Sequence, residues 1–246
     1  MSETVRLLFW NTYCENSDSG RITSCLDALS PDVVVMCEAT EGHLEAVARR
    51  YRHVVQARDY LQDGVLCHVA IAAQVPLSDI SVVRHGEINK APASWLARRM
   101  GWVEFLDTLA ASLPALGFRV LCLHLSAGCG PMRRRRELEA AAEQISLEGP
   151  MVVAGDFNSF SEPWLAPILA APLGYTWRDW GWRERSANDA WFAERGFTPA
   201  IDGITFPRFQ LRMDQIYVRD VTLTTGGAVS ELWGSDHRPV MITLST

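Results

Sequence analysis

The chain has 246 residues, of which 48% are hydrophobic and 21% are charged, a composition typical of an ordinary folded globular protein. The formal net charge is -6 at pH 7, so no overall positive field attracts nucleic acid, although a local groove could still do so. No apolar run approaches membrane-spanning length, and the six cysteines show no CxxC pairing, which argues against a zinc site. We expect a reduced, cytoplasmic protein with no membrane insertion and no obligate protein partner.

Short apolar runs rich in β-branched residues predict strands along the whole chain. They lie at residues 5–10, 33–37, 65–73, 119–124, 151–154, 213–218 and 240–244. Helical periodicity between these runs predicts helices at residues 20–29, 41–51, 131–147 and 164–170.

Two segments, residues 78–100 and 174–209, show no clear period and are expected to be long irregular loops. Loops of this length inside a compact domain are often functional. No internal repeat, low-complexity tract or linker interrupts the sequence, so a single domain over residues 1–246 is the simplest organisation.

Polar residues follow the predicted strands, where a sheet delivers side chains to a common edge. These residues are Asn11, Glu38, His124, Ser126, Asp156, Asn158, Asp214, Asp236 and His237. Each alone is a weak signal, because a glutamate after a strand is usually solvated and a histidine in a leucine-rich run is usually a core residue. As a set, their carboxylate and amide oxygens suit Mg²⁺ or Mn²⁺, and a hard cation would relieve repulsion between clustered carboxylates.

Six short motifs contain these residues. They are Trp10-Asn11, Cys37-Glu38, His124-Leu125-Ser126, Gly155-Asp156-Phe157-Asn158, Met213-Asp214-Gln215-Ile216-Tyr217 and Ser235-Asp236-His237-Arg238-Pro239. In this order they resemble the endonuclease/exonuclease/phosphatase (DNase I-like) superfamily, over nearly the whole chain. The resemblance implies an α/β (α+β) fold, a four-layer sandwich of two packed mixed β-sheets flanked by helices.

The resemblance also implies metal-dependent hydrolysis of a phosphoester, with Mg²⁺ or Mn²⁺ as cofactor. Glu38 would be the principal metal ligand, and Asp236 would add a metal contact. Asn11 would contact the metal or the phosphate.

The remaining residues would act on the water and the phosphate. Asp156 would orient or deprotonate the attacking water, and Asn158 would bind the scissile phosphate or hold that water. His237 would contact the phosphate, with Asp214 fixing its tautomer, and His124 would bind phosphate or serve the leaving oxygen. An aligned water, neutralised phosphate charge and help for the leaving oxygen are what phosphodiester hydrolysis requires.

The substrate stays open at this point. A nuclease acting on DNA or RNA is the first hypothesis, and Arg133-Arg134-Arg135-Arg136 is the only dense basic run that could serve it. Four consecutive helical residues cover a full turn, so at most two should face the site, while the others are solvated or pair with acids such as Glu137 or Glu139.

The alternative is a phosphodiesterase or phosphatase acting on a small or lipid-derived phosphate substrate. Relatives commonly carry a Ser-Arg pair where this chain has Ala73-Gln74, which leaves the substrate in doubt. Four tryptophans, Trp177, Trp180, Trp182 and Trp191, could line a pocket or stack a base, although such residues are more often core. A non-catalytic binding module is less expected, because every metal and phosphate position is filled.

Overall fold

The structure is a computed structural model that describes residues 4–84, 103–159 and 183–245. The helix predicted at residues 164–170 lies outside these ranges, as do Trp177, Trp180 and Trp182.

One sheet has seven strands in the described ranges, in the order β12–β13–β1–β2–β4–β3–β6. β1 and β2 run parallel, whereas the other neighbouring strands run antiparallel. The strands are β1 (Thr4–Asn11), β2 (Val33–Ala39), β3 (His53–Gln62), β4 (Val65–Ala73), β6 (Val103–Glu104), β12 (Thr222–Ala228) and β13 (Val240–Ser245).

The other sheet has six strands within the same part of the chain, in the order β10–β11–β9–β8–β7–β5. Here β8 and β9 are the parallel pair, and the other neighbours are antiparallel. The strands are β5 (Ser78–Val83), β7 (Thr108–Leu113), β8 (Phe118–His124), β9 (Met151–Asp156), β10 (Thr198–Pro199) and β11 (Asp214–Arg219). Both sheets are therefore mixed.

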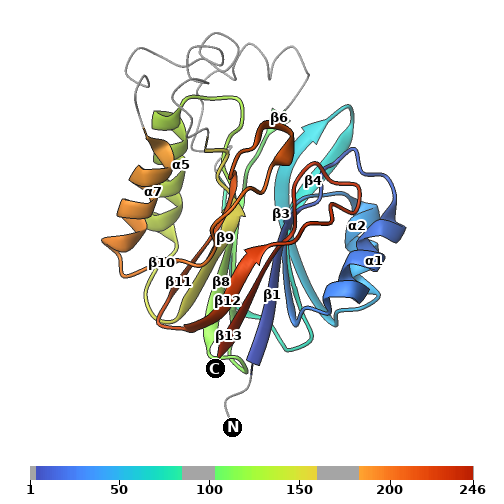
Figure 1. Cartoon of the computed structure of the whole chain (residues 1–246), viewed down its shortest axis with the longest axis horizontal. Coiled ribbons are helices and arrows are strands. Elements are labelled where there is room, and N and C mark those ends of the chain that lie inside the picture. Colours follow the sequence, from blue (N-terminus) through green and yellow to red (C-terminus); the bar gives the residue numbers. More distant parts are fainter. Residues whose placement is uncertain (1–3, 85–102, 160–182, 246) are drawn as a thin grey trace.

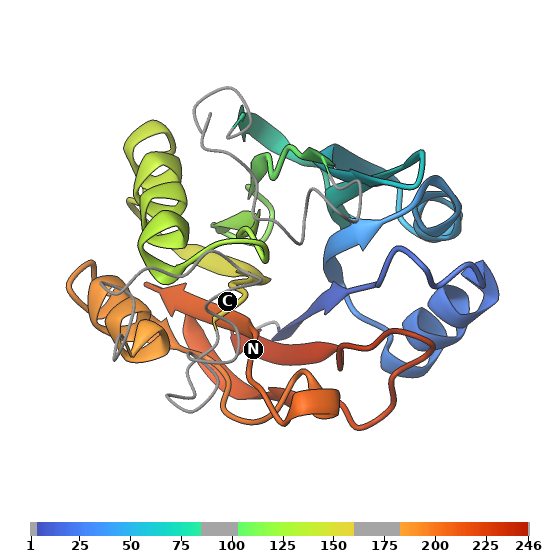
Figure 2. The same ribbon diagram turned by 90° about the horizontal axis from the view of Figure 1, so that it is seen from above.

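Helices cover the outer faces of the two sheets. α1 (Ser19–Leu29) and α2 (Glu41–Ala48) lie on one side, and α5 (Pro131–Gln144) and α7 (Glu184–Ala193) lie on the other (Figures 1 and 2). The predicted four-layer sandwich is confirmed. Among the described residues, no helix is both long and apolar enough to cross a membrane.

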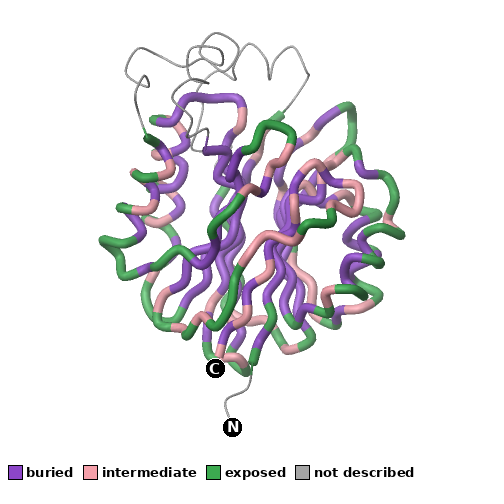
Figure 3. The backbone as a smooth tube through the Cα atoms, viewed as in Figure 1, coloured by how far each residue is buried: buried purple, intermediate pink, exposed green. Residues whose placement is uncertain are grey.

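Three apolar clusters fill the spaces between the four layers. The largest lies between the sheets, and the two others lie between each sheet and its helices. β1 shows how one strand serves two of them, because Leu7 and Phe9 enter the central cluster whereas Leu8 and Trp10 face the helices. Strands buried on both faces read as continuous apolar runs, and Figure 3 shows these strands in the buried centre of the molecule.

Two sequence predictions were wrong in the described residues. The segment predicted as a loop from residue 78 begins with β5, an edge strand that is largely exposed and therefore lacks an apolar signal. The segment predicted as irregular from residue 174 contains α7, which buries Trp191 and Phe192 but has no side-chain cap to mark its start. The prediction also missed β3, β7 and β12.

Gly155 in β9 fits against the neighbouring strand only because it has no side chain. A Cβ atom built there would lie 2.2 Å from the backbone oxygen of Leu123, its partner in β8. We expect Gly155→Ala to lower the free energy of unfolding by about 1–3 kcal/mol, as overpacking typically does. Urea denaturation would measure the loss.

Gly227→Ala in β12 is the matched control, since nothing lies within 4 Å of its added Cβ. The control should change stability by less than about 1 kcal/mol. Equal losses in the two variants would show that the contact with Leu123 is not the cause.

Candidate active site

The sheet topology brings the predicted polar residues to one edge of the sandwich. Asp156 ends β9, and it lies opposite His124 at the end of the parallel strand β8. Asp214 begins β11, which is antiparallel to β9, so it also lies opposite Asp156. These three residues belong to the six-stranded sheet. In the seven-stranded sheet, Asn11 ends β1 beside Cys37 and Glu38 near the end of β2.

Asn11 joins the carboxylates of the two sheets. Its fully buried Nδ2 donates to Glu38 Oε1 at 2.9 Å and to Asp156 Oδ2 at 3.0 Å. Its Oδ1 accepts from the backbone of Tyr13 at 3.1 Å, which fixes the amide orientation. Two carboxylates from different sheets are thereby held on the same amide nitrogen.

Glu38 stands in a strained and closely held backbone position. Its φ of 54° lies in the left-handed region, where the β2–β4 register shifts, and a non-glycine residue there costs about 1 kcal/mol or more. The backbone N of Glu38 donates to Asp59 Oδ2 at 2.8 Å. Its Oε2 accepts from the Tyr60 hydroxyl at 2.7 Å and from the backbone of Cys14 at 3.3 Å, so the half-buried carboxylate is aimed by several donors.

His124 is paired with a carboxylate that the sequence prediction missed. Its Nδ1 donates to both oxygens of the fully buried Asp59, at 2.8 and 2.9 Å. Burial by itself would lower the pKa of His124, but the charge and hydrogen bond of Asp59, together with the Asp156 and Glu38 charges, hold that pKa well above its usual range. The other ring nitrogen, Nε2, lies 4.0 Å from Asp156 Oδ2.

His237 forms a second pair of the same kind. Its Nδ1 donates to Asp214 Oδ2 at 2.8 Å, and its Nε2 lies 3.8 Å from Asp156 Oδ2. Burial opposes the charged imidazole, but the Asp214 and Asp156 carboxylates outweigh it and raise the pKa of His237 to about 10. The site therefore presents two histidine–aspartate pairs that flank the Asp156 carboxylate.

Asn158 and Asp236 take different positions in the site. Asn158 is buried next to Asp156, whose Oδ1 accepts from its backbone N at 2.8 Å, and its side-chain Nδ2 donates to the Leu125 carbonyl. Asp236 is only half-buried, and burial raises its pKa to about 6. Its carboxylate is not among the groups of clustered ligand atoms found in the described residues.

The donor set fits a hard divalent cation. The ligand atoms of Glu38, His124 and Asp156 lie within 4.8 Å of one another, as do those of Asp156, Asp214 and His237. Both groups contain carboxylates, and carboxylate oxygens are the ligands that suit Mg²⁺ or Mn²⁺. Glu38 and Asp156 are the residues that would hold the ion.

The arginine run at residues 133–136 is mostly occupied inside the protein. Arg134 is buried and forms a two-point ion pair with Glu184, at 2.6 and 2.9 Å. Arg133 pairs with Glu137 at 3.2 Å and with Glu104 at 3.5 Å, and Arg135 pairs with Glu139 at 2.7 Å. The pairs with Glu137 and Glu139 agree with the prediction that at most two of the four arginines face the site while others pair with these acids.

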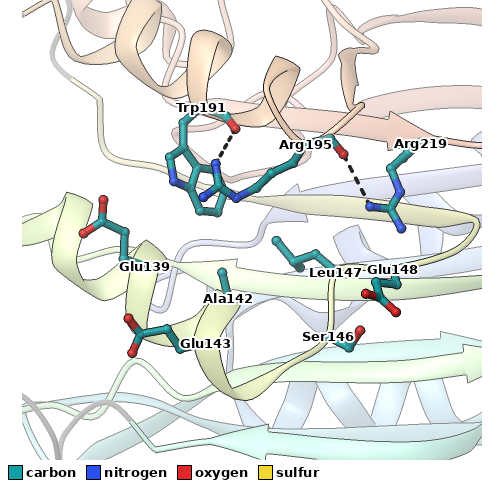
Figure 4. Close-up of a pocket in the computed structure, with 9 residues that line it drawn as sticks. All are labelled: Glu139, Ala142, Glu143, Ser146, Leu147, Glu148, Trp191, Arg195 and Arg219. Atoms are coloured by element: carbon teal, nitrogen blue, oxygen red, sulfur yellow. Dashed lines mark hydrogen bonds between the residues drawn. The ribbon is translucent and has the colours of Figure 1, made fainter.

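A pocket of about 560 Å³ lies elsewhere, between α5, α7 and the segments that follow them (Figure 4). It contains none of the proposed catalytic or metal-binding residues, and three glutamates and two arginines give it a lining of mixed charge. Trp191 also borders it but is 4% exposed, with the guanidinium carbon of Arg195 at 3.9 Å from its ring centre. That ring is therefore engaged within the protein rather than presented to a base.

Comparison with known proteins identifies the class to which this site belongs. The sequence profile of the Endonuclease/Exonuclease/phosphatase family matches residues 8–237, a span that contains every candidate residue. The chain belongs to this family. Endonuclease/exonuclease/phosphatase enzymes hydrolyse phosphoester bonds, and this chain is a phosphoesterase of that class. The resemblance found in the motifs is thereby confirmed.

Solved structures of the family share the fold at low sequence identity. An endonuclease/exonuclease/phosphatase from Beutenbergia cavernae aligns with a TM-score of 0.72 at 18% identity, covering 98% of this chain and 71% of that one. D. rerio TDP2, complexed with single strand DNA product, aligns at 0.65 and 14%, covering 99% and 100%. A mannosyl-6-phosphatase from Bacteroides thetaiotaomicron aligns at 0.65 and 15%, covering 98% and 99%. No curated protein matches the chain significantly.

Asp59 offers a test of how the site is held. In Asp59→Asn the charge that pairs with His124 is lost, and one of the two oxygens facing His124 Nδ1 becomes an NH₂ donor. We expect the free energy of unfolding to fall by about 1–3 kcal/mol, as for other hydrogen bonds to charged groups. The pairing with Asp59 raises the pKa of His124, so it stabilises the fold most below the unfolded pKa of about 6.5. The stability lost in Asp59→Asn should therefore shrink as pH rises through the raised pKa.

The measurement is urea unfolding of the metal-free protein at several pH values, with an NMR titration of His124. Asp63→Asn is the control, because Asp63 is exposed in a left-handed turn position that asparagine tolerates equally well. An unchanged titration of His124 in Asp59→Asn would contradict the assigned pairing.

Proposed function

We propose that this phosphoesterase cleaves phosphodiester bonds in a nucleic acid, with Mg²⁺ or Mn²⁺ bound through Glu38 and Asp156. The observation that carries the proposal is the convergence of two histidine–aspartate pairs on the Asp156 carboxylate. A divalent cation there supplies charge neutralisation for the phosphate. The rest of the chemistry is assigned to side chains of this chain.

The two imidazoles suit the two ends of the reaction. Asp156 accepts a proton from the attacking water or orients it, since its Oδ2 faces both histidines while Asn11 and Asn158 hold it in place. We assign His237 to the phosphate oxygens, where a donor held by Asp214 stabilises developing charge. We assign His124 to the leaving oxygen, because an alkoxide is a poor leaving group and needs a proton when it departs.

Two observations favour nucleic acid over a small phosphate as the substrate. His124 provides an acid for the leaving oxygen of a diester, and TDP2, which shares the fold, has been solved with its single-strand DNA product. One observation favours the alternative, a small or lipid-derived phosphate substrate. Three of the four arginines at residues 133–136 form intramolecular ion pairs, so the run does not form a basic groove for a phosphate backbone. The mannosyl-6-phosphatase on the same fold shows that this alternative has precedent.

Organisation and location are proposed on more general grounds. The seven-stranded sheet combines strands from both ends of the chain, β1 to β4 with β12 and β13, which supports a single domain over residues 1–246. The six cysteines are all free, as suits a reduced, cytoplasmic protein. We propose that no obligate protein partner is required.

The function is tested with plasmid DNA, single-stranded RNA, a generic phosphodiester and a phosphomonoester as substrates. We expect turnover of nucleic acid that disappears in EDTA and returns with Mg²⁺ or Mn²⁺. Glu38→Gln keeps the side-chain shape but removes a charged ligand, so it should weaken Mn²⁺ binding by at least about 10- to 100-fold. Titration calorimetry with Mn²⁺ would measure that loss directly.

Glu139→Gln serves as the control, because that exposed glutamate pairs only with a helix arginine. It should leave Mn²⁺ affinity unchanged. Full activity in excess chelator would rule out metal dependence, and turnover of the phosphomonoester alone would favour the small-substrate alternative.

The His237–Asp214 pair yields a separate kinetic prediction. Asp214→Asn and His237→Ala should each lower turnover by about 10²- to 10⁴-fold without unfolding the protein. Because the two groups act as a unit, the double variant should be little worse than the worse single variant. Steady-state kinetics of the three variants would check this, and multiplicative losses would show that the residues work independently.

A further inference from the structure

A short loop beside the site, from Thr205 to Leu211, is closed by its own hydrogen bonds. Phe206 and Leu211 exchange backbone bonds of 2.9 and 3.0 Å, with η2 (Pro207–Phe209) between them. Gln210 adopts a left-handed conformation, and its side chain bonds to the Pro207 carbonyl at 2.8 Å. The loop is thus a preformed hairpin that holds its tip in one arrangement.

The same loop is fastened to the catalytic segments. Thr205 Oγ1 accepts from the backbone of Met213 and of Asp214, both at 3.0 Å. The backbone of Arg238 donates to the Thr205 carbonyl at 2.7 Å. Since Asp214 and Arg238 adjoin the His237 pair, the loop tip has a fixed position relative to the proposed phosphate contact.

Two aromatic rings lead outward from His237 along this loop. The Phe206 ring lies 4.9 Å from the His237 ring, and the Phe209 ring stacks on Phe206 at 5.7 Å with an interplanar angle of 29°. Beneath them, Phe206 packs on Leu211 and Met213, an apolar cluster separate from the three cores between the layers. The rings therefore rest on a firm support.

Phe209 at the end of this chain is exposed. It is 52% exposed, the highest value among the large hydrophobic side chains of the described residues. The guanidinium carbon of Arg208 lies 5.7 Å from its ring centre. An exposed ring held rigidly beside a cation, at the edge of a phosphate site, has the composition of a stacking surface for a base with its phosphate.

We propose that Phe209 stacks an unpaired nucleobase that flanks the scissile phosphate, so that the enzyme prefers single-stranded or frayed nucleic acid over intact duplex. This inference rests on the proposed function and deepens it. Every base offers a planar face to an aromatic ring, but in a duplex both faces are already covered by neighbouring bases. Arg208 would contact the phosphate of the stacked nucleotide.

An acyl chain is a poorer occupant of this surface. The apolar part of the tip is one flat ring between Arg208 and Gln210, both exposed, whereas lipid binding draws on a broader apolar face. A single stacked base needs no more area than the ring supplies.

The test measures binding by fluorescence anisotropy, in Ca²⁺ to suppress turnover. The probes are a short single-stranded oligodeoxynucleotide, the same oligomer with abasic spacers in place of its bases, its duplex, and vesicles of anionic phospholipid. The variants are Phe209→Ala and Phe209→Trp, with Ile80→Ala as the control because Ile80 is 50% exposed on the edge strand β5. Thermal unfolding would check that each variant is folded.

We expect the wild type to bind the single strand more tightly than the abasic oligomer or the duplex. Phe209→Ala should weaken single-strand binding by about 5- to 150-fold, the effect of one stacked base, and leave abasic binding within about twofold. Phe209→Trp should retain binding, and Ile80→Ala should change nothing.

Equal losses for the normal and abasic oligomers would overturn the proposal, as would unchanged binding in Phe209→Ala or a wild-type preference for duplex. Weakened vesicle binding with unchanged oligomer binding would overturn it in favour of lipid. Hydrolysis of the same oligomers with Mg²⁺ separates this inference from the proposed function. If the normal and abasic oligomers are bound and hydrolysed equally well, only the stacking subsite is contradicted. If binding depends on the bases but no hydrolysis occurs, the subsite is supported and the proposed reaction is contradicted.

Discussion

The Asp156 carboxylate, buried where the two sheets meet, sets the requirements that its surroundings satisfy. A buried charge is tolerated only with donors around it, and Asp156 receives Asn11 Nδ2, the backbone of Asn158 and the approach of two imidazoles. Each donor is itself fixed by a further acceptor, Asp59 for His124 and Asp214 for His237. The shells around Asp156 therefore alternate in charge outward, so removing one member leaves its buried partners incompletely satisfied.

This dependence links the two sheets, whose shared core is largely apolar. Cys37 and Cys122 meet between the sheets with their sulfurs 4.0 Å apart, as small apolar side chains that let the strands approach. Near the same edge, Asp59 of one sheet binds His124 of the other and also the backbone of Glu38. One buried carboxylate thus orients the proposed acid on one sheet and the proposed metal ligand on the other, which accounts for a strained backbone at Glu38.

The sequence predicted the central strands and most of the site, but not the supporting partners. Strands buried on both faces carry strong apolar signals, and their ends placed Asn11, Glu38, His124, Asp156 and Asp214 correctly at one edge. β3 was missed because its exposed and polar positions hide the pattern, and Asp59 and Tyr60 were missed with it. Asp63-Gly64, with positive φ at both residues, was an available signal, since Asp-Gly between two strands is typical of a tight hairpin. The pairing of Asp59 with His124 depends on contacts between distant strands, which no local pattern encodes.

The same structure limits how nucleic acid could be held. A protein that grips a backbone through many arginines gains affinity by releasing counterions from each phosphate. Here the net charge is -6, and in the described part of the chain the dense arginine run is directed largely to internal glutamates. These arginines tie α5 to its neighbours, because buried Arg134 satisfies both the Ser126 carbonyl and Glu184. Under the proposed function, affinity in that part of the molecule would depend on a few contacts at the reacting phosphate and on the proposed ring stacking next to it. An enzyme built this way would gain little from substrate length and most from the chemical groups adjoining the bond that it cleaves.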